Sequence, residues 1–229
     1  MKRITVMALL AVLFIGVLAF GVEAAGTQNK HIEQSVKLLK EVETKSGAST
    51  LAHALAEGRG VVIFPTVLNV AAGVGGLGGD GVVMMKSEDG KWFGPSFARL
   101  EGLTAGLELG VDEIGIICVI NDVDALNRFT DGRKFTLGAD ASVVAGPWSA
   151  DADTAKRAKA EASLYSYTMA KGVFAGASVD GAMVESMASL NKAYWNKDET
   201  PSTALTTPAT DARVQPLVAE LVKLEKMGK

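Results

Sequence analysis

A run of glycines constrains the fold of this chain more than any other feature. Six of the nine residues 73–81 are glycine. The spacing Gly73-x-Gly75-x-x-Gly78 matches the dinucleotide fingerprint, which needs a preceding strand, a helix that starts within it and an acidic residue about 20 residues later. Here the run leads instead into a β-prone segment, residues 82–85. Without a helix N-terminus a pyrophosphate lacks its amide donors, so we interpret the glycines as backbone geometry, a glycine-rich turn after a strand.

The N-terminus has the features of a secretory signal. Lys2 and Arg3 precede an uncharged apolar run from residue 4 to residue 22, and small residues flank Glu23 at the expected cleavage site. We predict cleavage after Ala24 and a periplasmic or secreted mature protein. The alternative is an uncleaved inner-membrane anchor, because the run is about long enough to cross a bilayer. No cysteine lies near this site to carry an acyl anchor.

Composition and motifs argue against several function classes. The chain has 23 Lys and Arg against 26 Asp and Glu, which does not favour nucleic acid as a partner. Its single cysteine, Cys118, lies in an apolar run that is typical of a strand buried on both faces. The two histidines, His31 and His53, do not form a metal-binding pair, and no phosphate-binding loop or nucleophile elbow is present. We therefore predict no catalytic residue, no cofactor and no metal site.

One catalytic arrangement stays open, namely a pair of carboxylates that are distant in sequence. Most of the candidates lie beside glycine, where a role in a turn is favoured. An enzyme would need two of them in one deep pocket. The candidates are Asp80, Glu108, Asp112, Asp140 and Asp180.

The hydrophobic pattern predicts helices near both ends and strands between them. Pro65 is expected to stop the first strand, Asp89-Gly90 to form a hairpin turn, and Asp122 to cap a short helix. The predicted helices cover residues 31–45, 51–57, 122–129, 150–162, 186–195 and 213–226; the strands cover 61–64, 82–86, 91–93, 101–111, 114–120, 134–144, 164–169 and 173–179.

The strand at residues 101–111 has the clearest alternation. Leu103, Val111 and the apolar residues between them point to one side, which we expect to face a core. Glycines dominate the other side. A face without side chains permits sharp coiling or the close approach of another backbone.

These elements predict an α+β fold with a strongly coiled antiparallel sheet and flanking N- and C-terminal helices. Repeated Asp-Gly turns favour antiparallel pairing, because parallel neighbours need long crossovers. The pattern leaves open whether the sheet closes toward a barrel. We divide the chain into a signal at residues 1–24, a domain at 25–199, and a Pro/Thr-rich linker with a C-terminal helix at 200–229.

Basic residues on the first helix are candidates for contact with anionic headgroups. The ordinary alternative is a solvated helix face. Each lysine near a charged membrane could contribute about 1 kcal/mol. The candidate lipid-binding residues are Lys30, Lys37, Lys40 and Lys45, together with Lys86 and Lys91.

The order and spacing of several motifs resemble those of the SYLF lipid-binding domain over roughly residues 33–195. The motifs are Val62-Ile63-Phe64-Pro65, the glycine run through Gly81-Val82, Trp92-Phe93-Gly94-Pro95-Ser96-Phe97, Gly102 to Gly106 with Glu108-Leu109-Gly110, Phe135-x-Leu137-Gly138-Ala139-Asp140-Ala141, Ala145-Gly146-Pro147, Tyr165-Ser166-Tyr167, Lys171-Gly172-Val173-Phe174-Ala175-Gly176 and Asn191-x-x-Tyr194-Trp195.

This resemblance implies a binding module without known catalysis. Eukaryotic members of the family bind phosphoinositide membranes, partly through an N-terminal amphipathic helix, and some bind actin; bacterial members are exported envelope proteins described as lipid-binding. The resemblance therefore implies a phospholipid or membrane surface as partner, with the helix that carries Lys37 and Lys40 in contact with it. A structural or protein-interaction module of the envelope is the alternative. The chain departs from the family pattern in its Ala/Lys-rich residues 151–161 and in a weakly basic segment before Leu51.

Overall fold

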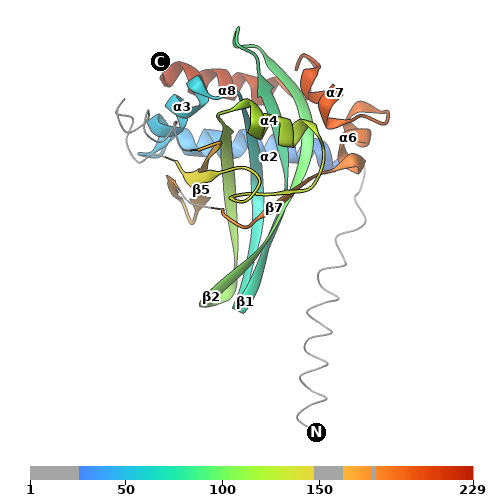
Figure 1. Ribbon diagram of the computed structural model, residues 1–229. Helices are drawn as coiled ribbons and strands as arrows, with labels where there is room; N and C mark the ends of the chain where they lie inside the picture. Colours follow the sequence, from blue (N-terminus) through green and yellow to red (C-terminus); the bar gives the residue numbers. More distant parts are fainter. Residues whose placement is uncertain (1–25, 147–161, 177–178, 229) are drawn as a thin grey trace.

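The computed structural model describes residues 26–146, 162–176 and 179–228 (Figure 1). The predicted signal at residues 1–24 lies outside these residues, and so does the predicted helix at 150–162 apart from Ala162. The helices are α2 (Thr27–Glu43), α3 (Ala48–Glu57), α4 (Val123–Thr130), α6 (Ala188–Trp195), α7 (Pro201–Thr206) and α8 (Gln215–Met227); the strands are β1 (Gly60–Lys86), β2 (Trp92–Ile120), β3 (Phe135–Thr136), β4 (Val143–Ala145), β5 (Leu164–Ala170), β6 (Val173–Gly176) and β7 (Met183–Ser186).

Two very long strands form the centre of the fold. β1 has 27 residues and β2 has 29, and they pair antiparallel from Gly60 opposite Ile120 to Lys86 opposite Trp92. The turn between them carries Gly90 with φ of 79°, a conformation that glycine adopts at little cost. The hairpin turn predicted from Asp89-Gly90 is therefore confirmed.

The long ribbon bends so that the two halves of β1 lie against each other. A Cβ atom on Gly81 would stand 2.5 Å from the carbonyl oxygen of Ile63, and one on Gly79 would collide with the carbonyl of Thr66. The backbone N–H of Lys86 also donates to the carbonyl of Arg59 at 2.8 Å. Gly79 and Gly81 thus permit the close approach of another backbone.

Two sequence predictions about β1 are wrong. The glycine run is not a turn, because residues 73–81 pair with β2 along their length. Pro65 does not stop the strand, because the register shifts between Phe64 and Val67 and the proline sits in that irregularity. A proline lacks an N–H to donate and is tolerated in a sheet at such a bulge.

Shorter strands extend the ribbon into a curled half-barrel. β5 pairs with β2 over residues 114–120, and β7 pairs with β2 over residues 98–101. β6 and β4 flank β5, and β3 flanks β7. The described strand pairs are antiparallel except for β4 with β5. The predicted α+β fold with a strongly coiled sheet is confirmed, and the parallel pair makes the sheet mixed.

Alternating side chains of the sheet fill two cores on its opposite faces. On one face Ile63, Val119 and Tyr167 pack with α2, α3, α6 and α8. On the other face Phe64 and Cys118 pack with α4 and α7. Within each covered stretch of β1, β2 and β5, alternate side chains therefore belong to the same core, as the geometry of a strand requires. The predicted burial of the strand at residues 114–120 on both faces is confirmed.

The middle of the ribbon runs beyond the helices. We call residues 68–77 of β1 and 102–113 of β2 the arm; Figure 1 shows part of β1 and β2 extending past the helices. The expectation that Leu103 and Val111 face a core is wrong, since they are 87% and 66% exposed. Alternation predicts burial only where another layer covers the strand, and the helices do not reach this part of β2.

The C-terminal segment packs into the same body. Residues 200–210, predicted as a linker, contain α7, where Leu205 is fully buried. α8 lies against α2 and α3 and buries Leu217, Leu221 and Leu224 completely. Within the described ranges, every helix is too short or too polar to span a bilayer.

Candidate binding surfaces

α2 is held against the body by its apolar side. Ile32, Leu39 and Val42 are at most 1% exposed and belong to the core beneath the sheet. On the other side of α2, exposed residues recur at helical spacing. We call them the α2 ridge: Lys30, Glu33, Lys37 and Lys40. Because the apolar side is already covered, this ridge is the part of α2 that a ligand can reach.

The ridge carries two lysines without an acidic partner. In the described part of the chain no carboxylate lies within 4.0 Å of Lys30 or Lys37, whereas Lys40 lies 3.7 Å from Glu220 of α8. Glu33 and Glu41 are exposed on the same helix. The ridge is therefore only moderately basic.

Lys45 and Lys91 are engaged in local ion pairs. Lys45 lies 3.8 Å from Glu41, one turn earlier on α2. Lys91 lies 2.5 Å from Asp89 within the hairpin turn, and this hydrogen bond raises the pKa of the lysine. Exposed pairs of this kind exchange readily with solvent, so both side chains remain available to a second anion.

Lys86 occupies a different environment from the other five lysines. Its side chain is 9% exposed, and its ammonium lies 2.8 Å from Glu225 of α8. It also donates to the carbonyl oxygens of Leu55 and Ala56, which the C-terminal end of α3 leaves without helical partners. A headgroup could reach Lys86 only by breaking these bonds, so we leave Lys86 out of the proposed contact surface.

Three of the five carboxylates considered for catalysis have structural partners, and the side chain of Glu108 is not among those that the structure describes. Arg99 donates to both oxygens of Asp80, from Nε at 2.6 Å and from Nη2 at 2.9 Å. Lys171 lies 3.1 Å from Asp112, and Asp140 accepts from the backbone N–H of Thr136 at 2.7 Å. These contacts brace strands and turns.

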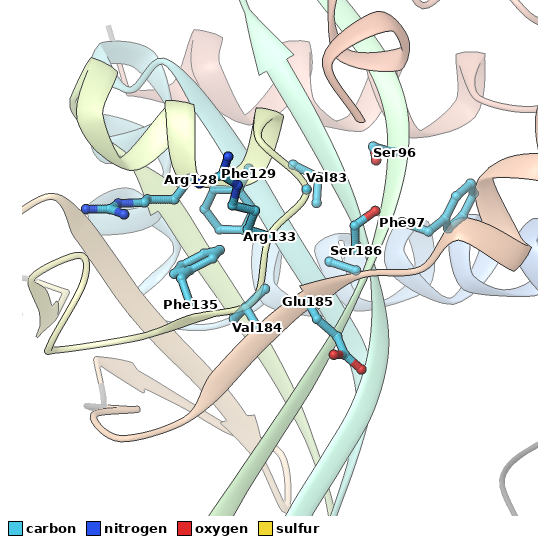
Figure 2. Close-up of a pocket in the computed structure, with 12 residues that line it drawn as sticks. Val83, Ser96, Phe97, Arg128, Phe129, Arg133, Phe135, Val184, Glu185 and Ser186 are labelled. Carbon is cyan, nitrogen blue, oxygen red and sulfur yellow. The ribbon is translucent and has the colours of Figure 1, made fainter. Parts of the chain in front are cut away.

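A small crevice lies between α4 and strands β2, β3 and β7 (Figure 2). The rings of Phe129 and Phe135 meet edge to face in it at 5.1 Å. Its space of about 10 Å³ is close to the minimum for one water molecule. Its lining residues are Val83, Ser96, Phe97, Ala98, Arg128, Phe129, Gly132, Arg133, Phe135, Val184, Glu185 and Ser186, which include none of the candidate carboxylates. The crevice is too small for an organic substrate.

The polar floor of this crevice is already hydrogen-bonded. Ser96 donates to Oδ1 of Asn191 at 3.3 Å, and Asn191 donates from Nδ2 to Ser186 at 3.3 Å. Both serines therefore serve Asn191 and leave little polar capacity for a ligand.

Buried reactive groups are poorly placed for chemistry. Burial raises the pKa of the Cys118 thiol to about 12, which disfavours the nucleophilic thiolate. Within the described ranges, no three His, Cys, Asp or Glu side chains gather closely enough to hold a metal ion. These observations direct attention to the outer surface.

Sequence reasoning missed the exposed apolar residues of the arm. Their alternation with glycine resembles that of a strand facing a core. The signal in the sequence was composition: residues 68–77 contain none of Asp, Glu, Lys or Arg, and their three glycines and two alanines supply little side-chain volume for a core.

Comparisons with known proteins agree on one family. The family model described as "Ysc84: Las17-binding protein actin regulator" matches residues 101–224. The "SH3 domain-containing YSC84-like protein 1" of Bos taurus is 28% identical over 171 residues, covering 72% of this chain and 50% of that protein. The "LAS seventeen-binding protein 3" of Saccharomyces cerevisiae strain S288c is 31% identical over 185 residues, covering 73% of this chain and 39% of that protein. The chain thus spans about half the length, or less, of these relatives.

Proposed function

Because the chain belongs to the Ysc84 family, the family of the SYLF domain that its sequence resembles, we propose that it is a binding module that attaches to anionic phospholipid headgroups through the α2 ridge. The family is one of binding and regulatory domains rather than enzymes. In this proposal the sheet is a rigid platform and α2 contacts the membrane surface without entering it. Lys30, Lys37 and Lys40 are the contact residues.

The observation that carries the proposal is the pair of lysines on a fixed helix that have no acidic partner among the described residues. Lys30 and Lys37 are two turns apart, so they lie on the same face of α2. Since α2 is already packed, binding would not require the helix to fold first, which lowers its entropic cost. Each lysine would contribute about 1 kcal/mol near an anionic surface, and the glutamates on α2 would offset part of that gain. Binding is therefore expected to be weak and sensitive to salt.

Flotation with liposomes tests this proposal. The protein should float with phosphatidylcholine vesicles that contain phosphatidylserine, and less well as phosphatidylserine is withdrawn or salt is raised. The double variant Lys30→Glu with Lys37→Glu should lose most of the flotation. Arg128→Glu with Arg133→Glu is the matched control, because these exposed arginines also lack an acidic partner among the described residues but lie beside the crevice of Figure 2. Equal flotation of the two double variants, or indifference to phosphatidylserine, would contradict the proposal.

A protein-interaction module is the second candidate function. The name of the yeast relative describes binding to another protein, and the arm presents exposed apolar side chains. Recovery of a stoichiometric protein partner by a purified chain that retains no lipid would favour this candidate over the first.

We also propose that residues 1–24 direct the chain to the cell envelope. The basic start, the apolar run and the small residues around Glu23 support export. N-terminal sequencing of the protein from a fractionated cell tests this directly. A soluble periplasmic or secreted form that begins at Ala25 would support cleavage, whereas a membrane-bound form that begins at Met1 would support the uncleaved anchor.

A further inference from the structure

We propose that the arm is a docking edge, where an extended segment of a partner protein that is rich in basic and apolar residues adds to β2 as an extra strand. This surface is separate from the α2 ridge, and its ligand is a peptide rather than a headgroup. The proposal therefore goes beyond the function proposed above.

The first observation is an unused strand edge. On one edge β2 pairs with β1, with three register shifts along the ribbon, while its other edge pairs with β7 over residues 98–101 and with β5 over residues 114–120. Between them, at residues 102–113, β1 is the sole strand partner of β2 within the described ranges. Backbone N–H and C=O groups on an exposed edge are a template for another strand.

The edge lacks two of the usual guards against such pairing, although its register with β1 shifts between Gly106 and Leu109. Sheet edges are commonly guarded by lysine or proline, and residues 102–113 contain neither. Gly102, Gly106 and Gly110 add no side chains that would obstruct an incoming backbone.

The second observation is the concentration of exposed apolar side chains around the arm. Of the seven large apolar side chains that are exposed in the described residues, five belong to the arm or to strands next to its base. Val70, Leu103 and Val111 lie on the arm, with Leu103 the most exposed at 87%; Val173 lies on β6 and Met183 on β7. Clustered exposure of this kind marks interaction sites.

The third observation is charge. Residues 101–113 contain four acidic residues and no basic one: Glu101, Glu108, Asp112 and Glu113. Lys134 lies 3.8 Å from Glu101 and Lys171 lies 3.1 Å from Asp112, so neighbouring segments supply a cation to two of these four residues. A segment with lysine or arginine among apolar residues would complement both the negative charge and the exposed apolar side chains of the edge.

Two other occupants fit these observations less well. A membrane interior would leave the N–H and C=O groups of an open edge without partners, and it would bury carboxylates. A second copy of this chain would place the same acidic edge against itself, and like charges on paired strands repel. The combination of open edge and negative charge favours a cationic peptide.

Fluorescence anisotropy with a labelled peptide tests the proposal. The probe is Lys-Val-Lys-Val-Thr-Val-Lys-Val-Lys, which alternates basic and apolar residues. The control peptides replace every Lys by Glu, or the central Thr by Pro to prevent strand pairing. The probe should bind the full chain, and both control peptides should bind about tenfold more weakly or worse.

Matched variants locate the binding. The double variant Leu103→Lys with Val111→Lys places two cations on the edge. It should weaken binding of the probe by about tenfold or more. Val123→Lys with Met227→Lys adds the same charge at exposed apolar positions on α4 and α8, and should leave binding unchanged. In the unaltered protein, bound probe should also slow amide hydrogen exchange within residues 102–113, a readout that needs no variant.

Several outcomes would overturn the inference. These are absence of probe binding, equal binding of the Glu peptide, equal weakening by both double variants, or no added protection at residues 102–113. A change from dimer to monomer caused by the two arm lysines would assign the edge to a second copy. Loss of flotation on neutral phosphatidylcholine vesicles in that variant would assign the arm to the membrane. The anionic flotation test of the α2 ridge succeeds or fails independently of all of these.

Discussion

Neighbouring carbonyl groups determine whether a lysine of this protein is buried or exposed to a ligand. Lys86 was predicted to contact lipid alongside Lys30 and Lys37, on residue type alone. In the structure the end of α3 presents two carbonyl oxygens to Lys86, and α8 supplies Glu225, 139 positions later in the sequence. No local pattern around residue 86 encodes that distant carboxylate, so the burial of this lysine could not be predicted. The exposure of Lys30 and Lys37 could be predicted from the sequence, because helical periodicity places them opposite Ile32 and Leu39.

His31 should make the stability of the fold sensitive to mild acid. Its ring nitrogens are buried and find no hydrogen-bond partner in the described part of the chain, and burial lowers its pKa below 6.5. Asp80, 4.0 Å away, opposes this shift, while Lys30 and Arg99 add to it. The unfolded chain therefore takes up the proton first as pH falls through about 6.5, and the free energy of unfolding decreases from there toward the lower folded pKa.

Urea unfolding at several pH values between 7.5 and 5 measures this effect. We expect His31→Gln to reduce the loss of stability over that window, whereas His53→Gln, which removes the other histidine, should retain it. Carboxylates also change the free energy of unfolding at the acid end of this pH window. The effect of His31 is therefore taken from the difference between the two variants. An identical pH dependence in His31→Gln and in the unaltered protein would show that His31 is not the source.

At the scale of single elements, β1 depends on glycine at some positions and not at others. We expect Gly81→Ala to cost about 1–3 kcal/mol, because its methyl group would stand 2.5 Å from both the carbonyl oxygen of Ile63 and the ring of Phe64. Gly76→Ala is the matched control on the same strand, since the nearest atom to its added methyl lies 3.6 Å away. It should be neutral or stabilising by up to about 1 kcal/mol. Denaturant melts of the two variants provide the comparison, and equal stability would show that the halves of β1 separate at little cost.

The elements that the sequence predicted well are those with local causes. α2 and α3 follow from apolar spacing, and Asp122 caps α4 by accepting from the backbone N–H of Ala125 at 2.7 Å. β1 has no such local cause across its glycines, which have low strand propensity on their own. Its partner β2 supplies the hydrogen bonds there, and pairing between distant segments overrides propensity. The same reason explains why β2 was predicted as three separate strands, at residues 91–93, 101–111 and 114–120, rather than as one.

At the scale of the whole molecule, the C-terminal helices belong to the stability of the body. Leu217, Leu221 and Leu224 of α8 are fully buried, and burial of each such side chain is worth about 1.5–3 kcal/mol. Their sum approaches the total stability of a typical domain, about 5–15 kcal/mol. We expect a fragment of residues 25–199, the predicted domain, to lack cooperative thermal unfolding by circular dichroism, whereas residues 25–229 should show it. A fragment that melts as cooperatively as the longer chain would support the predicted domain boundary at residue 200.

The sheet with a core on each side has a consequence for how this family can diverge. At residues 97–100 and 116–120 of β2, the buried apolar side chains belong to one core or the other according to whether their position is odd or even. Replacements in Phe64 and Leu164 on one side should therefore add to replacements in Ile63 and Tyr167 on the other, while replacements within one side should couple. Substitutions can therefore accumulate in one core independently of the other, while both cores share the long ribbon between them.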